Sequence, residues 1–203
     1  MPRRSGYVDP TTGILTNLVH ARTIAELVSA EHDLVTVRHI QLSEHPLPGD
    51  FDLEHLKAIH RHLFGDVYPF AGQLRTVDIF KAGSTNQFAP ARTLVAAAAH
   101  VFVRIQEDNY LCGLDRDEFV EGLSRHFTAI NRLHPFREGN GRTQRVFLQY
   151  LAEHAGYQLD WSRIDRRDLL ATCRDRTLEA RCLMDAVTLP QREFAGPRAP
   201  EQY

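Results

Sequence analysis

Residues 134–145 read HPFREGNGRTQR. Because Pro135 disfavours the α conformation of the residue before it, we expect a helix to end near Asn131 and His134 to lie extended on a connecting loop. Residues 139–141, Gly-Asn-Gly, come directly before the apolar pattern of the next helix. Glycines at a helix N-terminus let successive backbone N–H groups converge, and with the helix dipole these groups form a nest for an anion such as phosphate. The stretch therefore predicts a phosphate-binding turn between two helices.

The charged side chains of the same stretch suit a polyphosphate. Arg142 and Arg145 are three residues apart, so they project on one helical face and can reach the same ligand. Glu138 beside a phosphate nest would be repulsive unless a cation lay between them, which indicates a ligand for Mg²⁺. His134 can accept a proton from a hydroxyl near neutral pH. Each feature alone is more often structural, but their combination predicts a catalytic site.

The composition excludes several classes of protein. The chain has 203 residues, enough for one folding unit with a real core, and its formal net charge of -2 lacks the positive excess of a nucleic-acid binder. Its three cysteines form no CxxC pair, and their odd number argues against a disulfide framework. The longest apolar run, residues 94–103, is too short for a membrane span, and no signal peptide is recognisable. We therefore expect a cytoplasmic protein that binds neither nucleic acid nor membrane, with a secreted effector as the alternative.

Hydrophobic spacing predicts a mainly α fold. Helical patterns cover residues 23–45, 52–65, 91–108, 115–131, 140–155 and 165–187. Asp52 is the expected N-cap of the second helix, and Gly65 is expected at its end. In the first helix, the apolar positions predict a buried face made of Ile24, Leu27, Leu34, Val37 and Ile40.

A change of period after residue 73 predicts one short β-hairpin over residues 74–88. Leu74, Val77 and Ile79 alternate as in a strand, and residues 83–86 form a turn cluster. We expect residues 21–188 to form a single domain, residues 1–20 to be an arm packed on it, and residues 189–203 to be a flexible tail.

A metal site made of histidines is a weak alternative. Only His55 and His62 of the trio His55, His60 and His62 share a helical face, and no carboxylate completes a ligand set in sequence. We therefore expect no structural metal there.

The stretch 134–145 resembles the Fic signature, His-x-Phe-x-Asp/Glu-Gly-Asn-Gly-Arg-x-x-Arg, at every fixed position. Residues 59–75, IHRHLFGDVYPFAGQLR, resemble the segment before the hairpin "flap" of that family, although Phe70 stands where Trp is common. Residues 7–17 and the helix after them resemble the lead-in of bacterial Fic proteins, so the resemblance covers about residues 7–188.

This resemblance implies transfer of AMP from ATP to a Ser, Thr or Tyr hydroxyl of a target protein, with release of pyrophosphate. It makes His134 the general base and Glu138 the ligand of Mg²⁺ between the α- and β-phosphates. It assigns the α-phosphate to Gly139, Asn140 and Gly141, the β- and γ-phosphates to Arg142 and Arg145, and an anchoring role in the core to Phe136.

The flap of the family implies target binding by strand addition, in which the target backbone pairs with the hairpin edge. The flap residues in this sequence are Lys81, Ala82, Gly83, Ser84, Thr85, Asn86, Gln87 and Phe88. The alternative is that residues 74–88 are a purely structural hairpin.

Regulation is indicated by a motif that the sequence lacks. Many Fic proteins carry an inhibitory Ser/Thr-x-x-x-Glu-Gly/Asn motif, whose Glu pairs with the second arginine of the signature. Here Glu precedes Gly or Asn only at Glu121 and Glu138, and the residues four positions earlier are Asp117 and His134. The chain therefore resembles the toxin of a toxin–antitoxin pair, in which a small antitoxin protein supplies the Glu to Arg145. For toxins of this kind, a type II topoisomerase subunit is a first target to test.

Two other functions remain open. Fic relatives can transfer UMP, phosphocholine or phosphate, and only phosphate transfer is disfavoured here, since the phosphorylating relatives typically have Lys in place of Gly141. A catalytically silent nucleotide-binding module would normally have lost His134, Glu138 or one of the arginines, and all are present.

Overall fold

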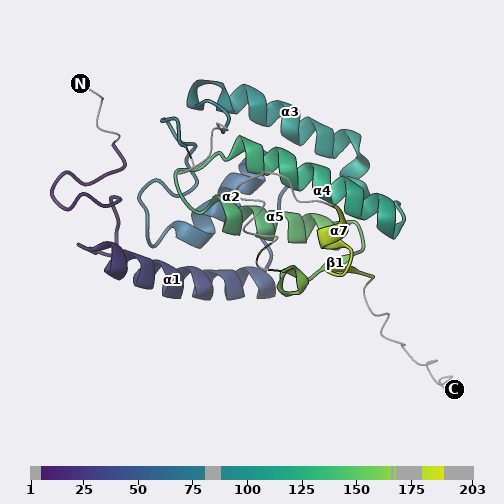
Figure 1. Ribbon diagram of the computed structural model, residues 1–203, viewed down its shortest axis with the longest axis horizontal. Coiled ribbons are helices and arrows are strands. Elements are labelled where there is room, and N and C mark those ends of the chain that lie inside the picture. Colours follow the sequence, from purple (N-terminus) through teal and green to yellow (C-terminus); the bar gives the residue numbers. More distant parts are fainter. Residues whose placement is uncertain (1–5, 81–87, 166, 168–179, 190–203) are drawn as a thin grey trace, which may run out of the picture.

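The computed structural model describes residues 6–80, 88–165, 167 and 180–189, and this part of the protein is predominantly helical, as the sequence predicts. Its helices are α1 (Ile24–Glu44), α2 (Leu53–Phe64), α3 (Leu94–Glu107), α4 (Arg116–Leu133), α5 (Asn140–His154) and the short α7 (Ala180–Leu183). Three 3-10 turns lie at Ala91–Thr93, Asn109–Leu111 and Trp161–Arg163, and two short strands, β1 (Gln158–Leu159) and β2 (Val187–Thr188), pair antiparallel. In Figure 1, α1 and α3 lie on opposite sides of the other helices.

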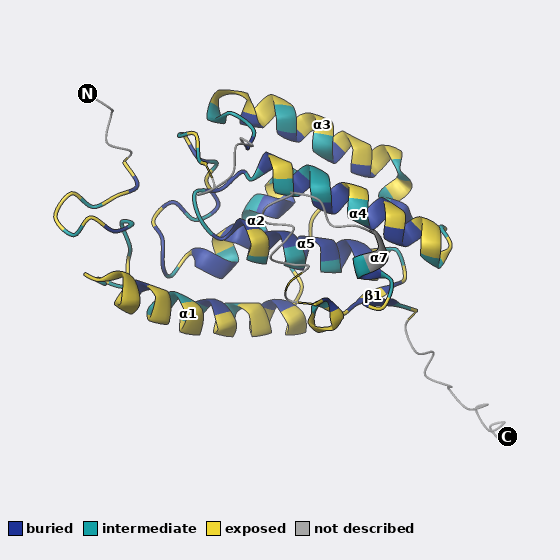
Figure 2. Cartoon of the chain, viewed as in Figure 1, coloured by how far each residue is buried: buried dark blue, intermediate teal, exposed yellow. Residues whose placement is uncertain are grey.

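Helix α5 is the centre of the domain. It packs against α2 and α4, while α1 covers α2 and α3 covers α4. Its side chains Phe147, Leu148 and Leu151 are fully buried, and Figure 2 shows burial along most of the helix. Burying an aliphatic or aromatic side chain of this size stabilises the fold by about 1.5–3 kcal/mol, so α5 is held firmly along its length. The N-terminus of this helix, where the candidate site lies, is therefore fixed in position.

The predicted helix starts are confirmed by their caps. The Thr23 hydroxyl accepts a hydrogen bond from the Glu26 backbone N–H, and the Glu26 carboxylate accepts one from the Thr23 N–H, each at 3.2 Å. Asp52 caps α2 by accepting from the His55 N–H at 2.8 Å, and Gly65 follows the last residue of that helix. Such caps satisfy N–H groups that the helix itself leaves unpaired.

The predicted buried face of α1 is partly wrong. Ile24, Val37 and Ile40 are 69%, 54% and 51% exposed, whereas Leu27, Val35 and Leu42 are buried. The apolar residues of α1 are spread around the helix, and only the side facing α2 is covered. The apolar spacing therefore does not identify the buried side.

The strand expected at residues 74–79 is absent, and only Phe80 has the character of a single β-bridge residue. Part of the physical reason lies in Arg75: its backbone N–H donates to the Pro135 carbonyl at 2.9 Å, so at this position the segment bonds to the α4–α5 loop. The rest of the expected hairpin, residues 81–87, lies outside the described residues.

The pairing of β1 with β2, Gln158 opposite Thr188, was not expected. Strands of two residues are too short to show a period, and the helix expected to continue to residue 187 ends at Leu183 among the described residues. Residues 168–179 and 190–203, which include most of that expected helix and the expected tail, lie outside the described part of the chain. In the described ranges, none of the helices has the length and apolar character needed to cross a membrane.

Candidate active site

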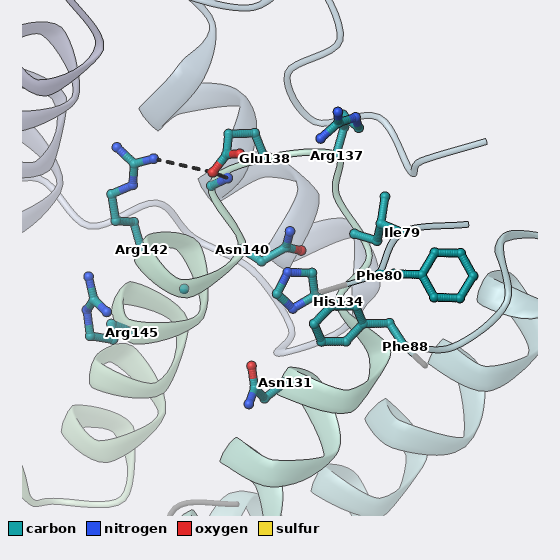
Figure 3. A pocket seen from close by; sticks show the side chains of 12 residues that line it. Ile79, Phe80, Phe88, Asn131, His134, Arg137, Glu138, Asn140, Arg142 and Arg145 are labelled. Carbon is teal, nitrogen blue, oxygen red and sulfur yellow. Dashed lines mark hydrogen bonds and ion pairs between the residues drawn. The ribbon is translucent and has the colours of Figure 1, made fainter. Parts of the chain in front are cut away.

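A cavity of about 510 Å³ opens where the end of α4, the start of α5 and residues 79–80 meet. All the residues assigned from the sequence to catalysis, metal and nucleotide line it: His134, Glu138, Gly139, Asn140, Gly141, Arg142 and Arg145. Ile79, Phe80, Phe88, Asn131 and Arg137 complete the lining. Figure 3 shows His134 and Asn140 on one side of this cavity and the guanidinium groups of Arg142 and Arg145 together on another.

His134 ends helix α4, but not in the extended conformation that the sequence predicts. Helix α4 continues to Leu133, and His134 adopts the left-handed conformation (φ 46°, ψ 61°) while its N–H donates to the Ile130 carbonyl at 3.0 Å. Pro135 stops the right-handed helix as expected, yet the chain leaves it through a left-handed cap. A non-glycine residue there costs about 1–3 kcal/mol, so surrounding contacts must hold the imidazole in place.

Two residues outside the signature supply those contacts. The Phe88 ring stacks on the His134 imidazole with ring centroids 3.8 Å apart and planes at 15°. The Arg75 side chain, 2% exposed, donates from Nε to the His134 carbonyl at 2.9 Å and from Nη1 to the Val77 carbonyl at 2.9 Å. Its Nη2 donates to the Ala89 carbonyl. Arg75 therefore fastens both ends of the segment between Val77 and Ala89 to the loop that carries the histidine.

The Gly139–Gly141 turn has the geometry of an anion nest. Gly139 has φ 77°, and a Cβ atom there would lie 2.4 Å from the Phe64 ring, so only glycine fits. As the N-cap of α5 it offers no side-chain cap to the first N–H groups of the helix, which suits the binding of an anion there. The N–H of Gly139 itself donates to the Glu138 carboxylate at 3.0 Å. Gly141 has ordinary space around it, since a Cβ atom there would lie 3.7 Å from Arg145 Nη1. The conformational need for glycine is therefore at Gly139.

Asn140 braces the loop from within. Its Oδ1 accepts from the Phe136 N–H and its Nδ2 donates to the Phe136 carbonyl, both at 2.8 Å. Phe136 is 1% exposed, as expected for an anchor in the core. The asparagine thus shapes the turn around the nest in addition to lining the cavity.

His60 also supports the loop. The sequence analysis considered this residue only as part of the rejected histidine metal site. The Gly72 N–H donates to Nδ1 at 2.8 Å, so Nδ1 is an acceptor and Nε2 carries the proton that it donates to the Glu138 carbonyl at 3.0 Å. Its ring stacks on Phe136 with centroids 3.8 Å apart. Burial lowers the pKa of His60 to about 4, which keeps the imidazole neutral. Among the described residues, no group of three or more His, Cys, Asp and Glu side chains could hold a metal ion.

The acidic and basic side chains at the cavity form a chain of contacts. Arg142 Nη2 lies 3.9 Å from Glu138 Oε1 and 2.6 Å from Oε1 of Glu31, a residue of α1 that sequence reasoning missed. The Arg142 guanidinium also lies over the Phe64 ring, 4.7 Å from its centroid. The Glu138 side chain is 44% exposed and faces the cavity beside the nest. One carboxylate beside phosphate oxygens is how proteins usually hold Mg²⁺, so the residues present fit that ion.

A nest at a helix N-terminus, a pair of arginines and a histidine at the mouth are the parts of an enzyme that acts on a phosphate compound. Residues 50–152 match the model of the Fic/DOC family. The chain belongs to this family, and the fold and signature seen above agree with that membership.

Relatives and solved structures narrow the class. The chain is 40% identical over 163 residues to "Protein adenylyltransferase VbhT" of Bartonella schoenbuchensis, a match that covers 80% of this chain and 34% of VbhT. It is 37% identical over 163 residues to "Probable protein adenylyltransferase Fic" of Escherichia coli, covering 80% of each chain. The chain thus spans about a third of VbhT and most of the Escherichia coli protein.

A solved structure shows the same fold. The N-terminal Fic domain of a putative cell filamentation protein from Bartonella quintana, which has bound ADP, matches with a TM-score of 0.85 and 25% identity. The match covers 91% of this chain and 95% of that domain. The named relatives place the chain in the protein adenylyltransferase class.

Proposed function

We propose that this protein transfers AMP from ATP to a Ser, Thr or Tyr hydroxyl of a target protein and releases pyrophosphate. The observation that carries the proposal is that one cavity is lined by His134, Glu138, the nest and both arginines. In this reaction His134 accepts the hydroxyl proton, the hydroxyl oxygen attacks the α-phosphorus, and the bond from that phosphorus to pyrophosphate breaks.

The residues divide the triphosphate among them. The N–H groups at the start of α5, with Gly139 and Gly141, hold the α-phosphate, and Arg142 and Arg145 hold the β- and γ-phosphates. Glu138 would hold Mg²⁺, which when bound neutralises the charge of the phosphates. Because Phe88 and Arg75 fix the His134 ring and carbonyl, the base stays at the cavity mouth, where an acceptor hydroxyl would enter.

The acceptor approaches along the flap segment that ends at Phe88. The backbone of the target protein pairs with residues 81–88 by strand addition, which fixes the position of the acceptor hydroxyl without selecting a side-chain sequence. The Phe80 side chain, 64% exposed and part of the cavity lining, offers an apolar contact to the incoming segment.

The protein is further proposed to be the toxin of a toxin–antitoxin pair that acts in the bacterial cytoplasm, with a type II topoisomerase subunit as the first target to test. The missing inhibitory motif supports this proposal, with an antitoxin Glu binding Arg145. Protein purified away from every co-expressed partner should label its target more strongly, and Arg145→Ala should weaken both ATP use and antitoxin binding. A partner-free preparation with unchanged labelling would contradict the antitoxin proposal.

The reaction is tested by incubating the protein with ATP, Mg²⁺ and bacterial lysate. We expect a protein band labelled from [α-³²P]ATP that is lost with His134→Ala. Label from [γ-³²P]ATP alone would show phosphate transfer, and label from UTP or CDP-choline in place of ATP would show transfer of UMP or phosphocholine. ATP binding without any transfer would indicate a silent module.

A further inference from the structure

Glu31 lies outside both the signature and the region that matches the family model, yet it contacts the site. It projects from α1, and its Oε1 lies 2.6 Å from Arg142 Nη2. The Glu31 side chain is 14% exposed and the Arg142 side chain 31%, so this ion pair is largely shielded from water. Shielding makes such a pair stronger than one on the open surface.

Glu31 is itself held in place from the other side. Its Oε2 accepts a hydrogen bond from the Tyr68 hydroxyl, and Tyr68 is 3% exposed. Burial, followed by the hydrogen bond to Glu31, raises the pKa of Tyr68, so its hydroxyl remains a donor. The Glu31 carboxylate therefore has one oxygen for Tyr68 and one for Arg142.

Arg142 lies between two carboxylates. Its Nη2 is 2.6 Å from Glu31 but 3.9 Å from Glu138, and its guanidinium rests on the Phe64 ring. Loss of the closer acid would leave Glu138 as the nearest anion, and the attraction between opposite charges grows as they approach. The Arg142 guanidinium would then move closer to Glu138 and form an ion pair with the carboxylate that faces the cavity.

We propose that Glu31 is a positioning residue that holds Arg142 away from Glu138 and so keeps both available for ATP. Glu31 does not line the cavity, so it acts through Arg142 and not by touching the nucleotide. The inference rests on the proposed function, since it assumes that ATP occupies this cavity.

The test is calorimetric binding of the ATP analogue AMP-PNP with Mg²⁺. We expect Glu31→Gln to weaken binding about tenfold, the size expected for a charge-assisted pair, and Tyr68→Phe to weaken it less. The matched control is Arg38→Met, which removes a second ion pair of α1, that of Arg38 with Asp66 just after α2, at 2.7 Å. This control should leave binding unchanged, and thermal unfolding reports whether each variant is folded.

A double-mutant cycle separates positioning from general packing. All four proteins of the cycle are compared without metal, because Glu138→Gln also removes the proposed Mg²⁺ ligand. If Arg142 moves onto Glu138 in Glu31→Gln, this substitution should weaken AMP-PNP binding in the wild-type background but change it less than twofold in the Glu138→Gln background. An equal loss in both backgrounds would overturn the inference, and so would unchanged binding in Glu31→Gln. Tighter binding would also overturn it, by showing that Glu31 competes with ATP for Arg142.

Wild-type protein that fails to bind AMP-PNP would overturn the proposed function, and this inference with it. Should Glu31→Gln fail to fold, Tyr68→Phe decides by the same criteria.

Discussion

The α4–α5 junction and helix α1 both reach the site, but they are held in different ways. At the junction, the side chains of Arg75, His60 and Asn140 bond to main-chain groups, so the loop between the helices is fixed at several backbone positions. Helix α1 reaches the site through one side-chain ion pair, and its outer face is exposed. Backbone positions held by several side chains do not shift when one neighbouring side chain is replaced. A contact between two side chains, in contrast, can be altered by a single substitution.

The largest expected effect is on chemistry at the junction. His134→Ala removes the proposed base and should lower the rate of target labelling by about 10²- to 10⁴-fold. AMP-PNP binding should be retained, because the nest and the arginines remain. A variant that labels the target at the wild-type rate would exclude His134 as the base.

Removing the brace at Arg75 should break the junction itself. Arg75→Met leaves the carbonyls of His134, Val77 and Ala89 without their donor in a buried place, and we expect a loss of about 3 kcal/mol in the free energy of unfolding. Urea denaturation measures this loss. A loss below about 0.5 kcal/mol would show that the loop does not depend on the guanidinium.

Two glycines two residues apart offer a matched comparison within the nest. Gly139→Ala places a methyl group against the Phe64 ring at a residue of positive φ. We expect it to lower the free energy of unfolding by about 2 kcal/mol. Gly141→Ala meets no such contact in the helix and should leave the free energy of unfolding unchanged or higher by up to about 1 kcal/mol. Equal effects in urea denaturation would contradict the described conformation of Gly139.

The buried His60 should make the junction sensitive to acid. Its folded pKa of about 4 lies below its ordinary value of 6.5, so between these values the unfolded chain binds more protons. The contribution of His60 to stability is therefore complete above about pH 6.5 and falls by about 1.4 kcal/mol per pH unit as the pH drops toward 4. In His60→Gln this part of the slope should disappear. Parallel stability–pH curves for the two proteins would show that His60 titrates normally.

The smallest effect is expected on the outer face of α1. Ile40 is 51% exposed, so Ile40→Ala should change the free energy of unfolding by less than about 0.5 kcal/mol. Leu42, 1% exposed on the same helix, is the matched control, and Leu42→Ala should cost about 2–5 kcal/mol. Similar losses for both would mean that the outer face of α1 is covered in solution.

The sequence predicted best where local chemistry decides the outcome. The Asp52 cap, the start of the first helix near Thr23 and the start of α5 follow from residue types acting on their near neighbours. The gathering of residues 134–145 around one cavity follows in the same way, because they are close in the chain. The errors arose where distant contacts decide, as in the buried side of α1 and the segment that Arg75 bonds to the α4–α5 loop.

The supporting residues of the site could not be predicted for a related reason. Glu31, His60 and Arg75 lie about 60 to 110 positions before the residues they hold, and no spacing rule connects them. A buried arginine or a neutral histidine is recognisable only once its surroundings are known.

The hydrogen bonds of Arg75 have a consequence for how the segment between Val77 and Ala89 can vary among such domains. One guanidinium bonds to the carbonyls of Val77 and Ala89, so the two ends of the intervening segment are clasped independently of what lies between them. Lengthening a flexible loop to twice its size costs only about 0.6 kcal/mol of closure entropy. The segment can therefore be replaced by one of another length and another sequence without moving His134.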